Sequence, residues 1–266
     1  MARRLHPALA VVTSVVLALL YAPLVAVAVM SLNAARHGTA WKGFTLGWYA
    51  RLFDSPAVIE AMRNTLVLAV ASTLMATVLG TLLAIAMARF PWPRGVRRGL
   101  DLLVYLPVVT PDILFAAALV VAYQFLRALS PIFNPGLLTM ILGHVTFQVA
   151  FVAIVVRGRL ATVGRSLDEA ARDLYATPFY LFRRVTLPLL APGIVAGAML
   201  AFTLSLDDFV ISFFTAGPTS ATLPLYIYAA VRRGVSPELH ALSTLIVLAT
   251  VCLVIALEAL TRLRTE

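Results

Sequence analysis

Three aspartates stand inside long apolar runs of this sequence, where an ionised carboxylate needs either water or a partner. They are Asp112 in one run and the adjacent pair Asp207 and Asp208 in another, and no basic residue is expected at a matching depth. On a straight helix that begins at Leu102, Asp112 would lie about 15 Å along the axis, near the middle of a bilayer. We interpret the three acids as a pathway for a cation. Paired structural acids remain the alternative.

Other chemically active side chains are sparse. His144 and Gln148 stand one helical turn apart in a further apolar run, and we expect them to form hydrogen bonds between helices. Cys252 stands alone in an apolar run and is interpreted as a small core residue. The four His and one Cys are too scattered for a metal site. No G-x-S-x-G or H-E-x-x-H motif is present, which makes an intramembrane hydrolase a remote alternative.

The composition indicates a membrane protein. The 266 residues are 61% hydrophobic and 12% charged, whereas soluble domains carry about 25% charged residues. The net charge is +9, and 20 of the 21 basic residues are Arg. We attribute this excess to cytoplasmic loops rather than to nucleic-acid binding. The single lysine, Lys42, belongs to no Walker A motif, so any ATP hydrolysis must come from another chain.

Six apolar segments are long enough to cross a bilayer, which takes roughly 20 residues. They run from about 8 to 30, 65 to 88, 102 to 125, 136 to 156, 189 to 214 and 239 to 259. Prolines before Asp112 predict a kink or break in the third segment. Residues 215–238 are expected to form a structured turn. These segments predict an all-α membrane protein whose residues 1–266 form one transmembrane domain.

The distribution of basic residues predicts the orientation. With the N-terminus placed in the cytoplasm, 14 Arg fall on the cytoplasmic side and 7 Arg and Lys on the other. A two-to-one bias favours this arrangement, with both termini in the cytoplasm. A loop of about residues 157–188 then faces the cytoplasm.

The charged part of this loop, residues 166–188, cannot cross a bilayer and must lie on one membrane face. Ser166 followed by Glu169 fits a capping box, which predicts a helix that begins near Leu167. Thr177 followed by Pro178 predicts the N-terminus of a second helix.

The second helix is expected to end at Leu187-Pro188, before the fifth apolar segment. The loop is therefore predicted to be a helix–turn–helix on the membrane face.

The spacing in this loop resembles the EAA loop of ABC importer permeases, EAA-x3-G-x9-I-x-L-P. The matching positions are Glu169, Ala170, Ala171, Tyr175, Val185, Leu187 and Pro188. Tyr175 replaces the usual Gly, which would adopt a left-handed turn without steric cost, and Val185 replaces Ile. The resemblance implies a type I ABC importer permease fold with six transmembrane helices. It also implies that the loop is a cytoplasmic coupling helix that docks on a separate ATPase.

A wider resemblance covers nearly the whole chain. The stretches around Trp48, Thr110-Pro111-Asp112, residues 202–225 and residues 234–238 are similar to PotC-type permeases of spermidine/putrescine importers. In that family, transport is associated with the positions that match Trp48, Asp112, Glu169, Ser205, Asp207 and Asp208. A polyamine carries ammonium groups on apolar methylenes, so carboxylates could pair its charges and an aromatic ring could add a cation–π contact.

The resemblance also implies the surroundings of the chain. These are a bacterial inner membrane and its lipid, a second permease subunit, an ATPase dimer that holds ATP and Mg, and an extracytoplasmic solute-binding protein. This chain would be a non-enzymatic pore subunit with no cofactor or metal of its own. Two alternatives remain open: an ABC permease for sulfate, iron or another solute, and a proton-coupled secondary carrier that uses the three aspartates.

Overall fold

The computed structural model describes residues 7–35, 40–164 and 166–263, which divide between two compact units. One unit comprises Met1–Ile59 and Tyr226–Glu266, and the other comprises Glu60–Leu225. The described residues form helices, joined by turns and one isolated antiparallel bridge between Asn33 and Phe44. The prediction of an all-α protein is confirmed.

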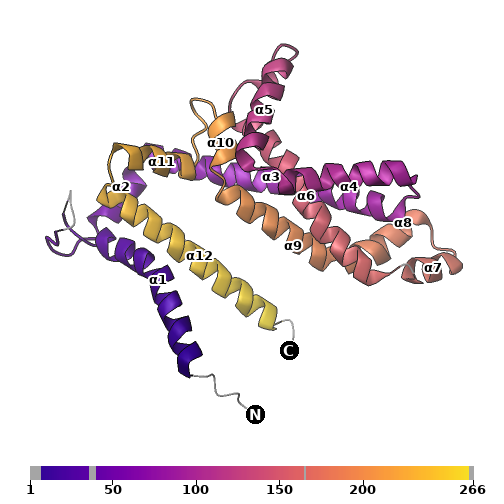
Figure 1. Cartoon of the computed structure of the whole chain (residues 1–266), viewed down its shortest axis with the longest axis horizontal. Coiled ribbons are helices and arrows are strands. Elements are labelled where there is room, and N and C mark those ends of the chain that lie inside the picture. Colours follow the sequence, from indigo (N-terminus) through magenta and orange to yellow (C-terminus); the bar gives the residue numbers. More distant parts are fainter. Residues whose placement is uncertain (1–6, 36–39, 165, 264–266) are drawn as a thin grey trace. The chain divides into compact units, whose positions relative to one another are not determined.

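The first unit is built on two apolar helices, α1 (Pro7–Ser31) and α12 (Pro237–Leu263), which pack against each other (Figure 1). The short helix α2 (Gly47–Asp54) packs on α12. The described side chains of α1 are exposed along most of its length, although they are largely Leu, Val and Ala. A helix that is apolar on all sides suits a lipid environment.

The second unit is centred on the pair α6 and α9, which pack along much of their length. Its helices include α3 (Pro56–Arg89), α4 (Arg94–Val109), α5 (Asp112–Leu126), α6 (Leu137–Val163), α9 (Leu187–Leu206) and α10 (Val210–Thr215). The core contains Val152, Val156 and Leu190, all with no exposed surface. A Cβ on Gly80 would lie 2.7 Å from the Cβ of Val152, so only glycine allows α3 to approach α6 this closely.

The described residues contain four helices long and apolar enough to span a membrane, or five if a bent pair counts as one span. The bent pair is α4 and α5, whose axes differ by 112° across a break at Thr110–Pro111. The predicted break is confirmed, but the depth calculated for Asp112 along a straight helix is wrong because the chain turns just before it. The apolar stretch Pro237–Cys252 in α12 is shorter than the other spans.

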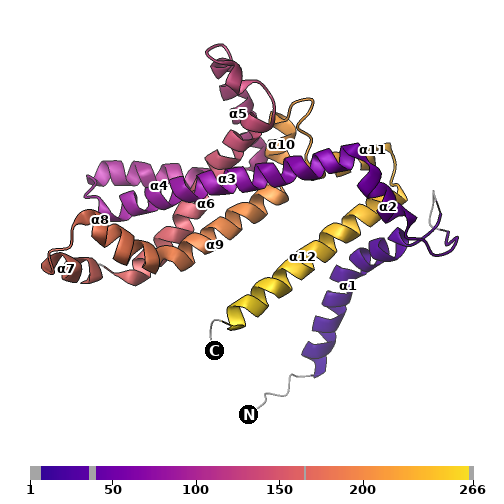
Figure 2. The same ribbon diagram turned by 180° about the vertical axis from the view of Figure 1, so that it is seen from behind.

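The segment after α6 differs from the expectation at one point. The short helices α7 (Ser166–Asp173) and α8 (Pro178–Leu181) form, but no break follows at Leu187–Pro188. A π-helical turn, η2 (Phe182–Thr186), instead joins α8 to α9. The wider π turn gives room for a proline ring that would otherwise crowd the carbonyl four residues earlier. In two views, α7 and α8 lie at the opposite end of the α6–α9 pair from α5 and α10 (Figure 1 and Figure 2).

The expected turn at 215–238 is partly wrong, because it contains the helix α11 (Leu223–Arg233). The preceding loop is held by α3: the Asn64 amide donates to the carbonyls of Thr219 and Ala221, each at 3.1 Å. The hydroxyl of Thr65 accepts from the backbone N–H of Leu223 at 2.8 Å. These bonds satisfy backbone groups that the turn leaves unpaired.

Candidate functional site: an acidic corner and a coupling segment

Asp207 and Asp208 form the corner between α9 and α10. The carboxylate of Asp208 accepts hydrogen bonds from the backbone N–H groups of Ile211 and Ser212, at 3.2 and 2.8 Å. It therefore caps the otherwise unpaired first turn of α10. Asp207 stands at the end of α9 and is exposed.

A fully buried histidine on α6 holds this corner. The Nε2 atom of His144 lies 3.2 Å from Oδ2 of Asp208 and 3.2 Å from the hydroxyl of Ser212. Its Nδ1 atom lies 2.8 Å from the hydroxyl of Ser205 on α9. The Ser205 hydroxyl in turn lies 3.3 Å from that of Ser72 on α3. Four helices of the second unit therefore meet in one hydrogen-bonded network.

The expectation that no basic residue matches the aspartates in depth is wrong for Asp208. The partner of Asp208 is His144, and only 10% of the Asp208 side chain is exposed. Asp208 therefore has the surroundings of a paired structural acid. The hydrogen bonding expected of His144 and Gln148 is confirmed, since the Gln148 amide donates to the carbonyl of Ala201 on α9 at 3.0 Å.

Ser205, His144 and Asp208 are also the residue types of a hydrolase triad, but the arrangement differs. In serine hydrolases the nucleophile contacts Nε2 and the acid contacts Nδ1. Here the two nitrogens are exchanged, and Ser205 is only 2% exposed. The geometry fits a network that joins helices, not one that attacks a substrate.

Asp112 is the first residue of α5 and is exposed. The bend before it places it at a helix N-terminus, where the backbone dipoles favour a negative charge. Because α5 packs on α10, both exposed acids, Asp112 and Asp207, belong to neighbouring parts of the second unit. The structure shows no direct contact between Asp112 and the His144 network.

Trp48 belongs to the other unit and is buried, with 6% of its surface exposed. Its indole N–H donates to the carbonyl of Asn33 at 2.8 Å. The guanidinium of Arg51 lies 4.8 Å from the ring centroid, within cation–π distance. Trp48 thus stabilises the loop that follows α1. A cation–π contact with a transported cation would require Arg51 to move.

The segment α7–α8, residues 166–181, is called the coupling segment after the role predicted from its sequence. A left-handed residue closes the turn between its two helices. Tyr175 has a φ of 59° and is 95% exposed. The N–H of Ala176 donates to the carbonyl of Ala171 at 3.0 Å, which is the long-range bond of a Schellman helix ending. Tyr175 therefore adopts the conformation that the usual glycine would provide.

Glu169 is exposed on α7, and Ala170 is exposed beside it. The predicted cap of α8 is confirmed: the Thr177 hydroxyl accepts from the N–H of Tyr180 at 3.3 Å. The side chain of Ser166 lies outside the described residues, so the capping box with Glu169 stays a prediction. Helix α7 begins at Ser166, one residue before the expected start.

The α6–α9 pair connects the coupling segment to the acidic corner. Near the coupling segment, Arg159 on α6 donates from Nε to the carbonyl of Leu189 at 3.1 Å. A Cβ on Gly193 would lie 2.6 Å from the Cβ of Arg159. The side chain of Arg159 on α6 therefore packs directly on the backbone of α9 at Gly193. Arg159 lies fifteen positions after His144, which corresponds to about 22 Å along α6. The two regions are therefore joined by one tightly packed pair of helices.

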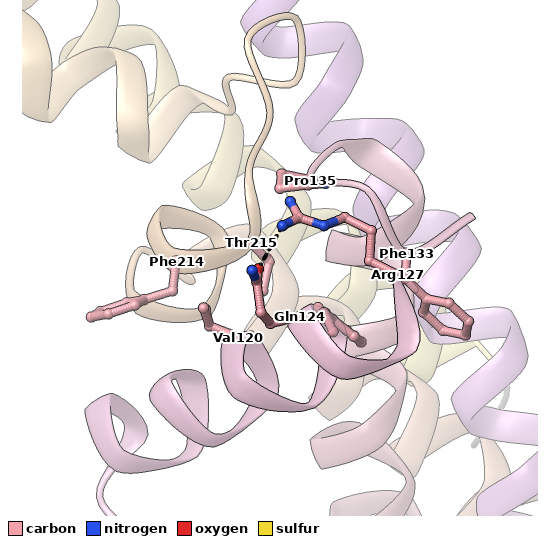
Figure 3. Close-up of a pocket in the computed structure, with 8 residues that line it drawn as sticks. Val120, Gln124, Arg127, Phe133, Pro135, Phe214 and Thr215 are labelled. Atoms are coloured by element: carbon pink, nitrogen blue, oxygen red, sulfur yellow. Dashed lines mark hydrogen bonds between the residues drawn. The ribbon is translucent and has the colours of Figure 1, made fainter. Parts of the chain in front are cut away.

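A small pocket lies between α5 and α10 (Figure 3). Arg127 donates to the side-chain oxygen of Gln124 at 2.8 Å at its rim, and Phe214 and Thr215 line the other side. The volume is about 40 Å³, far below the several hundred Å³ of typical small-molecule sites. This pocket does not hold a polyamine-sized molecule.

Comparison with known proteins identifies the family. Residues 76–264 match the family of binding-protein-dependent transport system inner membrane components. The chain belongs to this family. The permease is therefore a multi-pass inner membrane protein and the membrane component of a transport system.

Curated relatives and solved structures agree with this assignment. The permease is 40% identical over 228 residues to the putrescine transport system permease protein PotI of Escherichia coli (strain K12), covering 85% of this chain and 81% of PotI. It is 36% identical over 249 residues to the spermidine/putrescine permease PotC of the same strain, covering 94% and 92%. A bacterial ABC transporter involved in alginate import shares the fold, with a TM-score of 0.73 and 22% identity over 96% of this chain and 94% of that chain.

The residues that sequence reasoning missed are those that complete the network. Ser72 and Ser212 are ordinary small polar residues in apolar helices, and nothing in their spacing marks them. His144 was noticeable as a histidine in an apolar run. Its pairing with Asp208, 64 residues later, depends on how α6 and α10 pack.

Proposed function

We propose that this chain is the transmembrane subunit of an ATP-driven importer that translocates polyamines such as putrescine and spermidine. The observation that carries the proposal is the identity of 40% and 36%, over most of the chain, to two permeases named for these cargoes. The type I ABC importer permease fold, found here over nearly the full length, agrees with it.

The chemistry of the second unit supports a cationic cargo. Asp112 and Asp207 are exposed carboxylates in a unit built from apolar helices. Each could pair with one ammonium group while the methylenes of the cargo contact apolar side chains. An anionic cargo would be repelled by the same groups.

The proposed assembly contains a second permease subunit, an ATPase dimer with ATP and Mg, and an extracytoplasmic solute-binding protein. Both termini and the segment α7–α8 face the cytoplasm in this arrangement. The ATPases then dock on the exposed residues around Glu169, and the α6–α9 pair relays their closure to the acidic corner.

The test is uptake of radiolabelled putrescine and spermidine by the reconstituted complex, with ATP inside or absent. We expect ATP-dependent uptake that an uncoupler leaves intact. Uptake that collapses with an uncoupler and ignores ATP would favour a proton-coupled carrier instead. If the complex takes up another solute in an ATP-dependent way but no polyamine, the assignment as an ABC importer stands and the proposed polyamine cargo is wrong.

The coupling role of α7 is tested by Glu169→Ala, with Asp173→Ala as the matched control. Both are exposed acids on the same short helix. We expect only Glu169→Ala to lower cargo-stimulated ATP hydrolysis while insertion into the membrane stays normal. Equal, near-normal stimulation in both variants would contradict a specific contact at Glu169.

A further inference from the structure

We propose that His144 is a positioning residue that gives the two adjacent aspartates different tasks. By binding Asp208 in the interior, it leaves Asp207 as the acid of this pair that meets the cargo. This inference rests on the proposed function for the identity of the cargo, but its geometric part does not depend on it.

The first support is the saturation of Asp208. One carboxylate oxygen accepts from Ile211 N–H, and the other accepts from Ser212 N–H and lies 3.2 Å from His144 Nε2. An acid with this many fixed partners has little remaining capacity for an ammonium group. Asp207, one residue earlier, is exposed and is the C-terminal flanking residue of α9.

The second support is that a neutral His144 satisfies the network completely. With its proton on Nε2, the ring donates to the ionised Asp208. Its Nδ1 then accepts from the Ser205 hydroxyl, whose oxygen can accept from Ser72. Each of these four side chains then has a partner, which is the condition for such a network to rigidify its surroundings.

The third support is the position of His144 where several helices meet. Its ring side chain has no exposed surface, and it contacts Ser205 on α9 and Ser212 on α10. The same helix, α6, carries Arg159 at the end that packs near the coupling segment. The contacts of His144 with Ser205, Ser212 and Asp208 therefore hold the corner that carries Asp207 against α6.

Two substitutions remove the two contacts of the histidine ring separately: the contact of Nε2 with Asp208 and the contact of Nδ1 with Ser205. In His144→Asn the side-chain amide reaches about as far as Nδ1 and keeps the contact with Ser205, but it does not reach Asp208. In His144→Gln the amide reaches about as far as Nε2 and can still donate to Asp208. The variants are similar in polarity and volume, so each serves as the control for the other.

The expected result is a split between maximal rate and KM. His144→Asn should lower the maximal rate of polyamine uptake by about 10-fold or more, because a buried bond to a charged group is lost, and change KM little. His144→Gln should keep most of the rate. Asp207→Asn should instead raise KM, since it removes a charge that faces the cargo.

Asp208→Asn provides a second route if the histidine variants accumulate poorly in the membrane. It keeps the size of the side chain, and we expect it to lower the maximal rate as His144→Asn does. If Asp208→Asn raises KM to the same extent as Asp207→Asn, both acids contact the cargo and the proposed division of tasks is wrong.

A reporter that needs no cargo separates this inference from the proposed function. Cys252 is the only cysteine, so Cys252→Ser gives a background without thiols. Ile211→Cys then places a thiol at a position that is 3% exposed on α10. A water-soluble thiol reagent should modify this cysteine slowly in the protein that keeps His144 and in the His144→Gln variant. The modification should be several-fold faster in the His144→Asn variant. Equal protection in all three would overturn the positioning role, even if polyamine transport is confirmed.

Discussion

At the scale of single residues, two neighbouring aspartates meet very different surroundings. Asp208 turns inward to cap α10 and to meet His144, whereas Asp207 remains exposed at the end of α9. The cause is the end of the α-helix, since the residue after a helix C-terminus leaves the helical path and can direct its side chain elsewhere. Charge in this region is therefore divided between a structural acid and an accessible one.

Asp112→Asn tests whether the other exposed acid handles the charge of the cargo. The substitution keeps the shape of the side chain and removes its charge. Loss of a partly desolvated ion pair costs about 1–3 kcal/mol, so we expect roughly 5- to 150-fold weaker uptake of putrescine and spermidine. Competition by a neutral diol of similar length should not change. Asp54→Asn, an exposed acid on α2, is the control and should transport normally.

The types of the charged residues could be predicted from the sequence, but their partners could not. A carboxylate in an apolar run is conspicuous because its desolvation is costly. Whether it pairs with a histidine depends on tertiary packing of α6 against α10. Trp48 illustrates the same limit, since its burial under Arg51 follows from the fold of the loop and not from any local pattern.

At the scale of elements, the loop between α7 and α8 preserves its turn despite an unfavourable residue. Tyr175 lies in the left-handed region, which costs an ordinary L-residue about 1–2 kcal/mol. The bond from Ala176 to the carbonyl of Ala171 keeps the helix end closed. The turn is therefore specified by the helix ending and its neighbours as well as by residue 175.

Tyr175→Gly should stabilise this turn by about 1 kcal/mol, because glycine adopts a positive φ without steric cost. The measurement is amide hydrogen exchange across α7 and α8 in the reconstituted protein, where we expect slower exchange. Leu174→Gly is the control: its φ is not positive, and glycine there should speed exchange by weakening the helix end. Faster exchange in Tyr175→Gly would mean that the exposed tyrosine ring itself stabilises the loop.

Helix positions were predictable where the apolar segments are long, whereas the junctions between helices were harder to predict. Thr110–Pro111 predicts a break because proline lacks an N–H, but the 112° between α4 and α5 follows from packing on both sides of it. Pro188 was expected to end a helix, yet the π turn before it lets the helix continue into α9. Local sequence rules therefore predict where a proline disturbs a helix, but they do not predict the bend angle or whether the helix continues.

At the scale of the whole molecule, the second unit places its two candidate functional regions at opposite ends of one packed pair of helices. The network around His144 lies near the start of α6 and the end of α9, and the bond between Arg159 and Leu189 lies near their other ends. Close packing resists bending, so in the proposed mechanism a displacement at α7–α8 would be carried along the pair. This arrangement suits a protein that converts motion on one membrane face into access on the other.

The proposed direction of that coupling depends on the orientation of the chain in the membrane. The two-to-one excess of basic residues predicts that α7 and the start of α4 lie in the cytoplasm and that the loop after α1 lies outside. Single cysteines at Arg97, Asp173 and Lys42, introduced into Cys252→Ser, report on these three places. In right-side-out vesicles, a membrane-impermeant thiol reagent should label the cysteine at position 42 alone. After permeabilisation, the cysteines at 97 and 173 should also react, which shows that their lack of labelling was due to the membrane and not to burial.

Labelling of position 173 in sealed vesicles would reverse the topology. An ATPase could not then dock on α7, and the coupling proposed for Glu169 would fail together with the orientation.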